Sequence, residues 1–181
     1  TRELAAVVGE LREQVNVREQ AERRLTHDAL HDALTGLPNR TCFHLALEHA
    51  LERLHSDADH RFAVLFLDLD RFKVINDSVG HLYGDMMLKE SATRLAGCVR
   101  DTDMVARLGG DEFAVLMDGI DSPEEACDTA RRAIEALAAP MHVGGKELFT
   151  SASIGITLGE RRYHKAEDML RDADVAMYRA K

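Results

Sequence analysis

Two adjacent glycines between two apolar segments constrain the fold of this chain more than any other feature. Gly109 and Gly110 can adopt the positive φ angles that a tight turn between strands requires. They also let a phosphate group approach the backbone without meeting a Cβ atom. The sequence therefore predicts a β-hairpin over residues 104–117 with Asp111 and Glu112 at its tip.

Two carboxylates follow each other at this predicted tip. Since successive side chains on a strand point to opposite faces, at least one of Asp111 and Glu112 is expected to face the groove beside the turn. A solvated acidic hairpin explains these residues equally well when they are taken alone. A second acidic segment upstream favours the first interpretation.

Residues 62–69 form an almost continuous apolar run, which predicts a strand buried on both faces. Asp68 and Asp70 lie at its end. If this strand pairs with the hairpin, Asp68 approaches Asp111 or Glu112. Such a cluster of oxygen ligands suits Mg²⁺, with water and substrate phosphates completing the coordination. The pattern indicates phosphoryl or nucleotidyl transfer.

Composition bounds the class of protein. With 181 residues, 45% of them hydrophobic, we expect one domain with an appendage. The formal net charge of −9 disfavours a binder of nucleic-acid polymers, because such proteins need a basic surface to displace counterions. A nucleotide ligand needs only a local cationic cluster and is compatible with this charge.

Cysteine usage and hydropathy indicate a reduced, cytoplasmic setting. Cys42, Cys98 and Cys127 are widely spaced and odd in number, which disfavours a disulfide framework or a zinc site. No apolar run approaches the roughly 18 residues of a membrane span, and no signal peptide is evident. Because the sequence runs from Thr1 to Lys181 without an initial Met, we interpret it as a piece of a longer protein that could be membrane-anchored elsewhere.

Residues 1–30 contain no proline and show a heptad pattern, with spacings that alternate between four and three. One interpretation is a solvated amphipathic helix that packs on its own domain. The other is a parallel coiled coil that joins a sensor to the domain and assembles a dimer. Three or so heptads are marginal alone, so such assembly is expected to be weak. The heptad positions are Leu4, Val8, Leu11, Val15, Arg18, Glu22 and Leu25.

The remaining segments predict an alternation of helices and strands. Asn39 is placed to cap a helix after a Gly- and Pro-containing hinge, whereas the pair His27 and His31 lacks the further residues of a metal motif. Within the helix predicted over 123–138, we expect Ala126, Ala130, Ile134 and Leu137 to face inward. The other predicted elements are a helix with Phe43, Leu47, Leu51 and Leu54 inward, a helix starting at Gly84 and Asp85, a strand over 148–158 and a helix over 166–181.

The order of the core elements is β-α-β-β-α-β. This order predicts an α+β fold with a ferredoxin-like, palm-type core, in which flanking helices cover a central antiparallel sheet. The N-terminal coiled-coil-like helix precedes this core. We expect the boundary between the two parts near residue 30, which divides the chain into 1–30 and 31–181.

Residues 109–113 resemble the signature of the GGDEF family of diguanylate cyclases. The resemblance extends from about residue 30 to the end of the chain. Further matching segments are 32–40, 68–73, 76–77 with 80–81 and 84–85, and 173–181.

The resemblance implies that two GTP molecules are condensed into cyclic di-GMP, with release of two pyrophosphates, across a homodimer. It implies a Mg²⁺ cofactor, with Mn²⁺ as an alternative ion, bound by Asp68, the Leu69 carbonyl, Asp111 and Glu112. Asp111 and Glu112 are also the catalytic candidates. Glu112 either binds metal or assists deprotonation of the attacking 3′-hydroxyl.

Substrate contacts are implied in the same way. Asn76 and Asp85 match guanine-contacting positions, and a carboxylate acceptor suits the adjacent N1–H and NH₂ donors of guanine. The backbone of 71–73 is expected to wrap the terminal phosphates, while Lys73 and Lys181 match cationic contacts. The full set of substrate-binding candidates is Arg71, Phe72, Lys73, Asn76, Asp85, Gly109, Gly110 and Lys181.

Arg100 and Asp103 match the inhibitory site at which this family binds its product, with a surface ion pair as the simpler interpretation. Arg131 is a candidate second cation at that site. We expect a fused sensor domain upstream and allow for a phosphodiesterase domain downstream. An alternative function is a catalytically inactive GTP-binding module that regulates such a phosphodiesterase, but the intact signature acids disfavour it.

Overall fold

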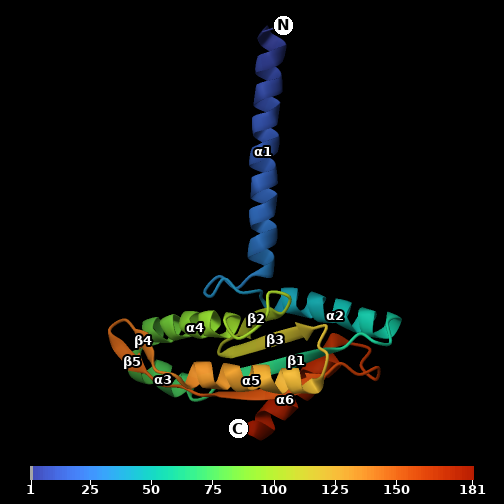
Figure 1. Cartoon of the computed structure of the whole chain (residues 1–181). Helices are drawn as coiled ribbons and strands as arrows, with labels where there is room; N and C mark the ends of the chain where they lie inside the picture. The colour runs from blue at the N-terminus through green and yellow to red at the C-terminus, as the bar shows by residue number, and fades with distance from the viewer. Residues whose placement is uncertain (1) are drawn as a thin grey trace.

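A computed structural model describes the backbone of residues 2–181 and the side chains of residues 12–22 and 24–181. Its central feature is an antiparallel sheet with the strand order β2-β3-β1-β6 (Figure 1). This is the order of a ferredoxin-like β-α-β-β-α-β core, so the predicted α+β fold is confirmed. The strands are β1 (Phe62–Leu69), β2 (Met104–Gly109), β3 (Glu112–Asp118) and β6 (Ala152–Leu158).

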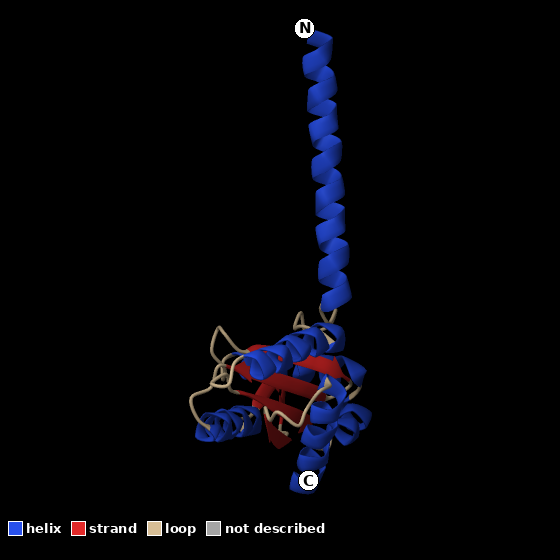
Figure 2. Cartoon of the chain, turned by 90° about the vertical axis from the view of Figure 1, so that its right-hand side faces the viewer, coloured by secondary structure: helices blue, strands red, loops and turns tan. Residues whose placement is uncertain are grey.

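Helices cover both faces of the sheet (Figure 2). Leu65 and Leu67 of β1 pack with residues of α4 (His81–Ala96) and α5 (Pro123–Ala138), whereas Val64 and Phe66 pack with α2 (Arg40–Ser56) and α6 (Ala166–Ala180). The continuous apolar run is therefore explained by burial on two sides. Each fully buried Leu, Val or Phe contributes about 1.5–3 kcal/mol of transfer free energy to the fold.

The inward face of α5 follows the prediction with one exception. Ala126, Ala130 and Leu137 are buried, but Ile134 is 41% exposed. Ala133 takes the inward position instead and is 1% exposed. The predicted bounds of this helix are confirmed.

The predicted start of the helix after β1 was wrong. A short helix, α3 (Phe72–Val79), precedes it, and α4 begins directly after Gly80, whose φ of 94° separates the two helices. Gly84 therefore lies inside α4. A Cβ atom there would lie 2.3 Å from Oδ1 of Asn76. Gly84 thus allows α3 to pack closely against α4.

The strand predicted over 148–158 is shorter than expected. It begins at Ala152, whereas Leu148, the first residue of the predicted strand, ends a separate hairpin of β4 (Met141–Val143) and β5 (Lys146–Leu148). Gly144 and Gly145, with φ angles of 55° and 78°, form its turn. This glycine pair occupies the whole two-residue turn, whereas only Gly110 of the first pair lies in the turn between β2 and β3.

Helix α1 (Arg2–Leu30) projects away from the sheet and its covering helices (Figures 1 and 2). Val15 and Leu25 on its predicted heptad face are 53% and 70% exposed, so this part of the helix does not pack on its own domain. Leu4, Val8 and Leu11 lie outside the described side chains, and the coiled coil stays a prediction. None of the described helices is long and apolar enough to cross a membrane.

Asn39 is the N-cap residue of α2 and also binds the end of α1. Its side-chain oxygen accepts a hydrogen bond from the backbone N–H of Cys42, which confirms the predicted cap. Its side-chain amide donates to the carbonyl of Ala29, and its backbone N–H donates to the carbonyl of Leu30. The connection between the projecting helix and the domain is therefore hydrogen-bonded on both sides.

Candidate active site at the hairpin tip

The pairing of β1 with β3 brings the predicted acidic residues together. Asp68 lies opposite Glu112 in the antiparallel register, and the backbone N–H of Leu69 donates to the carbonyl of Asp111 over 3.3 Å. The tip of the turn is formed by Gly110, with a φ of 54°, and Asp111, because Gly109 already pairs with Glu112. The tip thus lies one residue later than the glycine pair suggests.

Burial and neighbouring carboxylates raise the pKa of Asp111 and of Glu112. Burial, reinforced by the charge of Asp68, raises the pKa of Asp111. Burial also raises the pKa of Glu112, and Asp174, Asp68 and Asp111 add to this effect, while Arg40 offsets part of it. The site therefore holds more negative charge than its surroundings neutralise.

Two cations contact this cluster. Nζ of Lys181 lies 2.7 Å from Oδ1 of Asp68, and this hydrogen bond raises the pKa of the lysine. Nη2 of Arg40 lies 3.2 Å from Oε2 of Glu112. Asp111 has no ion-pair partner among the described side chains. The chain's last residue and the first residue of α2 thus meet at the hairpin.

The donor set has the chemistry that a divalent cation of the Mg²⁺ type requires. All the side-chain donors are carboxylate oxygens, and neighbouring carboxylates add to the burial that raises the pKa of Asp111 and Glu112, so a cation there would relieve repulsion. Among the described residues, however, no three His, Cys, Asp or Glu side chains already form a metal-binding group. Lys181 and Arg40 hold two of the three carboxylates in this state.

The loop after β1 forms the next part of the site. Arg71 is the only non-glycine residue with a positive φ among the described residues, at 58°, and it precedes α3. Arg71 and Lys181 line one open groove of about 790 Å³. Lys73 is exposed and does not line this groove, whereas the ring of Phe72 packs against the core. Phe72 therefore presents only its backbone to a ligand.

The guanine-contact candidates lie on α3 and α4. Asn76 donates from its amide nitrogen to Nδ1 of His81 over 2.9 Å, and its buried Oδ1 has no partner among the described residues. Asp85 is exposed on α4. Because a buried acceptor without a partner costs free energy, Oδ1 of Asn76, which packs against Gly84, is a polar group that this part of the fold leaves unsatisfied.

The product-site candidates do not pair with each other through their side chains. The guanidinium of Arg100 forms its ion pair with Glu125 of α5. Asp103 instead accepts a hydrogen bond from the backbone N–H of Arg100 over 3.0 Å. Arg131 pairs with Asp128 over 2.9 Å, on the exposed side of the same helix.

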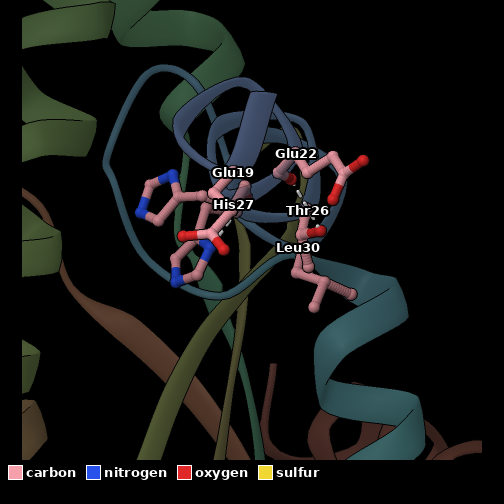
Figure 3. A pocket seen from close by; sticks show the side chains of 6 residues that line it. Glu19, Glu22, Thr26, His27 and Leu30 are labelled. Atoms are coloured by element: carbon pink, nitrogen blue, oxygen red, sulfur yellow. Dashed lines mark hydrogen bonds between the residues drawn. The ribbon is translucent and has the colours of Figure 1, made fainter. Parts of the chain in front are cut away.

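His27 lies in the last turn of α1 (Figure 3), and His31 directly follows the end of this helix. The rings of His27 and His31 stack with their centroids 3.9 Å apart, and Nδ1 of His31 donates to the carbonyl of His27. They line an open groove of about 450 Å³ together with Leu30. Ring stacking and the hydrogen bond from His31 to the carbonyl of His27 explain the positions of both side chains.

Two supporting networks were not predicted. Arg107 bridges both carboxylate oxygens of Asp32, at 2.9 and 3.0 Å, to the carbonyl of Gly110. Asp70 accepts hydrogen bonds from the hydroxyls of Ser151 and Ser153, which ties the end of β1 to β6. A sequence pattern gives the residue types but not these partners. The only signal was the position of Asp32 and Asp70 inside the matching segments.

The fold and the acidic hairpin define a ferredoxin-like domain whose site lies at one end of its sheet. Residues 29–181 match the family described as "Diguanylate cyclase, GGDEF domain". The chain therefore belongs to the GGDEF-domain family, as the signature resemblance predicted.

Several curated proteins and solved structures are similar to the chain. It is 46% identical over 158 residues to diguanylate cyclase TpbB of Pseudomonas aeruginosa strain UCBPP-PA14, covering 87% of this chain and 36% of that protein. It is 43% identical over 162 residues to the bifunctional diguanylate cyclase/cyclic di-GMP phosphodiesterase MucR of P. aeruginosa, covering 90% and 23%. The chain thus spans little more than a third of these relatives at most.

A solved GGDEF domain of P. aeruginosa TpbB has the same fold. The two structures superpose with a TM-score of 0.79 at 45% identity, over 83% of this chain and 88% of that one. The antiparallel sheet and its flanking helices are therefore those of the family.

Proposed function

We propose that this domain is a diguanylate cyclase, which joins two GTP molecules into cyclic di-GMP and releases two pyrophosphates. The observation that carries the proposal is the cluster of Asp68, Asp111 and Glu112 at the hairpin tip, where two carboxyl pKa values are raised. Surplus carboxylate charge beside an open groove suits a substrate that arrives with a divalent cation.

Asp68, the Leu69 carbonyl, Asp111 and Glu112 would hold Mg²⁺, with Mn²⁺ as an alternative. When bound, the ion supplies neutralisation of the pyrophosphate charge and a lower pKa for the 3′-hydroxyl. Glu112 lies at the edge of this cluster and is the candidate for accepting the hydroxyl proton. Gly109 and Gly110 leave the backbone of the turn free of side chains, which lets the phosphates approach.

Lys181 and the backbone at 71–73 would bind the terminal phosphates. Lys181 contacts Asp68 and also lines the groove beside Arg71. Its ammonium group can therefore leave the carboxylate of Asp68 and bind a phosphate in the groove by a movement of the side chain alone. Lys73 is exposed and would act as a longer-range cation. These contacts position the triphosphate without taking part in the proton transfer.

Asn76 and Asp85 would select guanine. Asp85 is exposed, so its carboxylate can accept from the N1–H and NH₂ donors of guanine, and Asn76 would join it by turning its Oδ1, unpaired among the described residues, away from Gly84. Adenine cannot offer these donors side by side. We therefore expect ATP to be a poor substrate, because unpaired polar groups in a site make discrimination steep.

Each domain holds only one of the two reacting nucleotides, so we propose a homodimer as the active species. Helix α1 leaves apolar side chains exposed away from the domain, which favours its use as the assembly element. Activity per domain is expected to fall on dilution, and deletion of residues 1–28 should raise the concentration at which half-maximal activity is reached. An equal dilution curve for the deletion variant and the intact chain would contradict this role of α1.

Arg100 and Asp103 remain the proposed binding residues for cyclic di-GMP as an inhibitor. Product binding would have to release Arg100 from Glu125. We expect Arg100→Ala to resist inhibition by added cyclic di-GMP at saturating GTP, whereas relief of wild-type inhibition by more GTP would point to competition at the active site. Arg131 is a weaker candidate, since Asp128 already holds it.

A second function has one observation in its favour. MucR combines cyclase and phosphodiesterase activities in its name, so a domain of this kind can lie beside a phosphodiesterase. An inactive GTP-binding module would regulate such a neighbour. The complete set of signature acids favours the cyclase. We further propose that the domain works in the cytoplasm and that a fused sensor domain lies upstream of it.

The decisive experiment incubates the protein with GTP and Mg²⁺ and separates the nucleotides by chromatography. We expect cyclic di-GMP and pyrophosphate, with no cyclic product from ATP. GTP that binds but stays unchanged at every protein concentration would support the regulatory module instead.

A further inference from the structure

Arg40 connects the two arms of the hairpin turn through one side chain. It is the first residue of α2, and its Nε donates to the carbonyl of Leu108 over 3.1 Å. Its Nη2 donates to Oε2 of Glu112 over 3.2 Å. Leu108 precedes the glycine pair and Glu112 follows the tip, so a single planar guanidinium spans the turn.

The turn needs such an external restraint. Gly109 and Gly110 adopt positive φ angles and carry no side chain that could pack, so little within the turn fixes its conformation. The carbonyl of Gly110 is held from the other side by Arg107, which Asp32 holds in turn. Arg40 is the contact that reaches a candidate catalytic carboxylate directly.

The fold itself does not require this contact. The side chains of Arg40 and Glu112 are 59% and 37% exposed, and an ion pair of this kind contributes little to the free energy of unfolding. Two hydrogen bonds of one guanidinium to both arms nevertheless fix the direction of the Glu112 carboxylate. The value of the contact therefore lies in geometry.

We propose that Arg40 is a positioning residue that orients Glu112 and holds the two arms of the turn together. The proposal rests on the cyclase function, because it concerns the arrangement of that reaction centre. Arg40 touches neither the nucleotide nor the reacting atoms in this account. It acts through Glu112.

The chain offers a matched control on the same helix. Arg53 in the last turn of α2 pairs with Asp118 at the far end of β3, and its side chain is 53% exposed. Arg53→Ala therefore removes the same kind of contact between the same two elements, but away from the turn. Arg40→Lys is the conservative variant, since one ammonium cannot reproduce the planar fork that reaches both acceptors.

The first readout separates kcat from KM. We expect Arg40→Ala to lower kcat between about 10-fold and 100-fold, because a small misplacement of a catalytic group has effects of this size. KM for GTP and the melting temperature should stay close to those of Arg53→Ala. Arg40→Lys should recover part of the lost kcat, and Arg53→Ala should have the kcat of the wild type.

The second readout does not depend on turnover. Amide hydrogen exchange over residues 108–112 is expected to be faster in Arg40→Ala than in the wild type, and unchanged in Arg53→Ala. A wild type that makes no cyclic di-GMP would overturn the proposed function, and exchange alone would then decide whether Arg40 restrains the turn. Equal kcat and equal exchange in the two alanine variants, or a change in KM or melting temperature alone, would overturn the proposal.

Discussion

The two ends of the β1–β3 pair carry similar residues but differ in charge balance. At one end Asp68 lies opposite Glu112, and at the other Asp118 lies opposite Phe62. Helix α2 contributes an arginine to each end, Arg40 to the first and Arg53 to the second. The same helix and strands therefore build both clusters.

The carboxylate at the far end is matched by one cation. Asp118 pairs with Arg53, and Nε2 of His60 lies 2.9 Å from its other oxygen, although without the alignment of a hydrogen bond. At the hairpin tip three carboxylates share two cations, Arg40 and Lys181. A matched cluster therefore supports the fold, whereas surplus negative charge marks the place for a cationic partner and its substrate.

The largest effect is expected from Asp68→Asn, which removes one charge from the tip while keeping the shape of the side chain. We predict a loss of cyclic di-GMP formation of about 100-fold or more, since the carboxylate is a proposed metal ligand. The melting temperature should change little, because the lost contact with Lys181 is offset by reduced repulsion of Asp111.

The control for this variant is Asp59→Asn. This is a change of the same kind on an exposed turn before β1, at the end of the strand away from the tip. Turnover measured by chromatography and melting followed by circular dichroism give the two readouts. Comparable activity of Asp68→Asn and Asp59→Asn would break the comparison between the two ends.

A smaller effect, on stability, is expected from Asp32→Asn. This residue lies near the tip but is matched by Arg107, so it should behave like the balanced end. Burial alone would raise the pKa of Asp32, but hydrogen bonds from Thr35 and Arg107 outweigh it and hold the pKa below its usual value. A lowered pKa means that the contribution to stability is present at neutral pH and is lost as the pH falls through the folded-state value.

We predict that Asp32→Asn lowers the free energy of unfolding by about 1–3 kcal/mol at pH 7, as expected for hydrogen bonds to a charged group. The difference from wild type should shrink as the pH falls below about 4, the usual value of an aspartate. Urea unfolding at a series of pH values measures it. A difference independent of pH would show that the carboxylate charge is not the source.

Much of this architecture could be predicted from local patterns. The apolar run of β1 and the glycine pair at 109–110 specify a buried strand and a tight turn through their own chemistry, so the central sheet followed. The resemblance of residues 109–113 named the candidate acids. Their approach to one another depends on strand pairing, which the β-α-β-β-α-β order supplied.

The errors arose where partners distant in sequence decide the outcome. The local sequence at Gly84 predicts the start of a helix. The glycine is needed instead because Asn76 lies against it and leaves no room for a Cβ atom. The product site at Arg100 and Asp103 stays a prediction, and the partner that its motif could not supply is Glu125 on α5, which binds the guanidinium of Arg100. Arg40 gave no signal beyond its position in the matching segment 32–40, since its two acceptors come from a hairpin far along the chain.

We expect the surplus of carboxylates at the hairpin tip, and not the balanced far end, to carry the reaction. The most direct measurement compares Asp111→Ala with Asp118→Ala in one assay of cyclic di-GMP formation, together with their melting temperatures. We predict that Asp111→Ala abolishes product formation without loss of stability, whereas Asp118→Ala melts at a lower temperature and keeps its turnover below that temperature. Undiminished product formation by Asp111→Ala, or an equal loss in both variants when folded, would contradict the account.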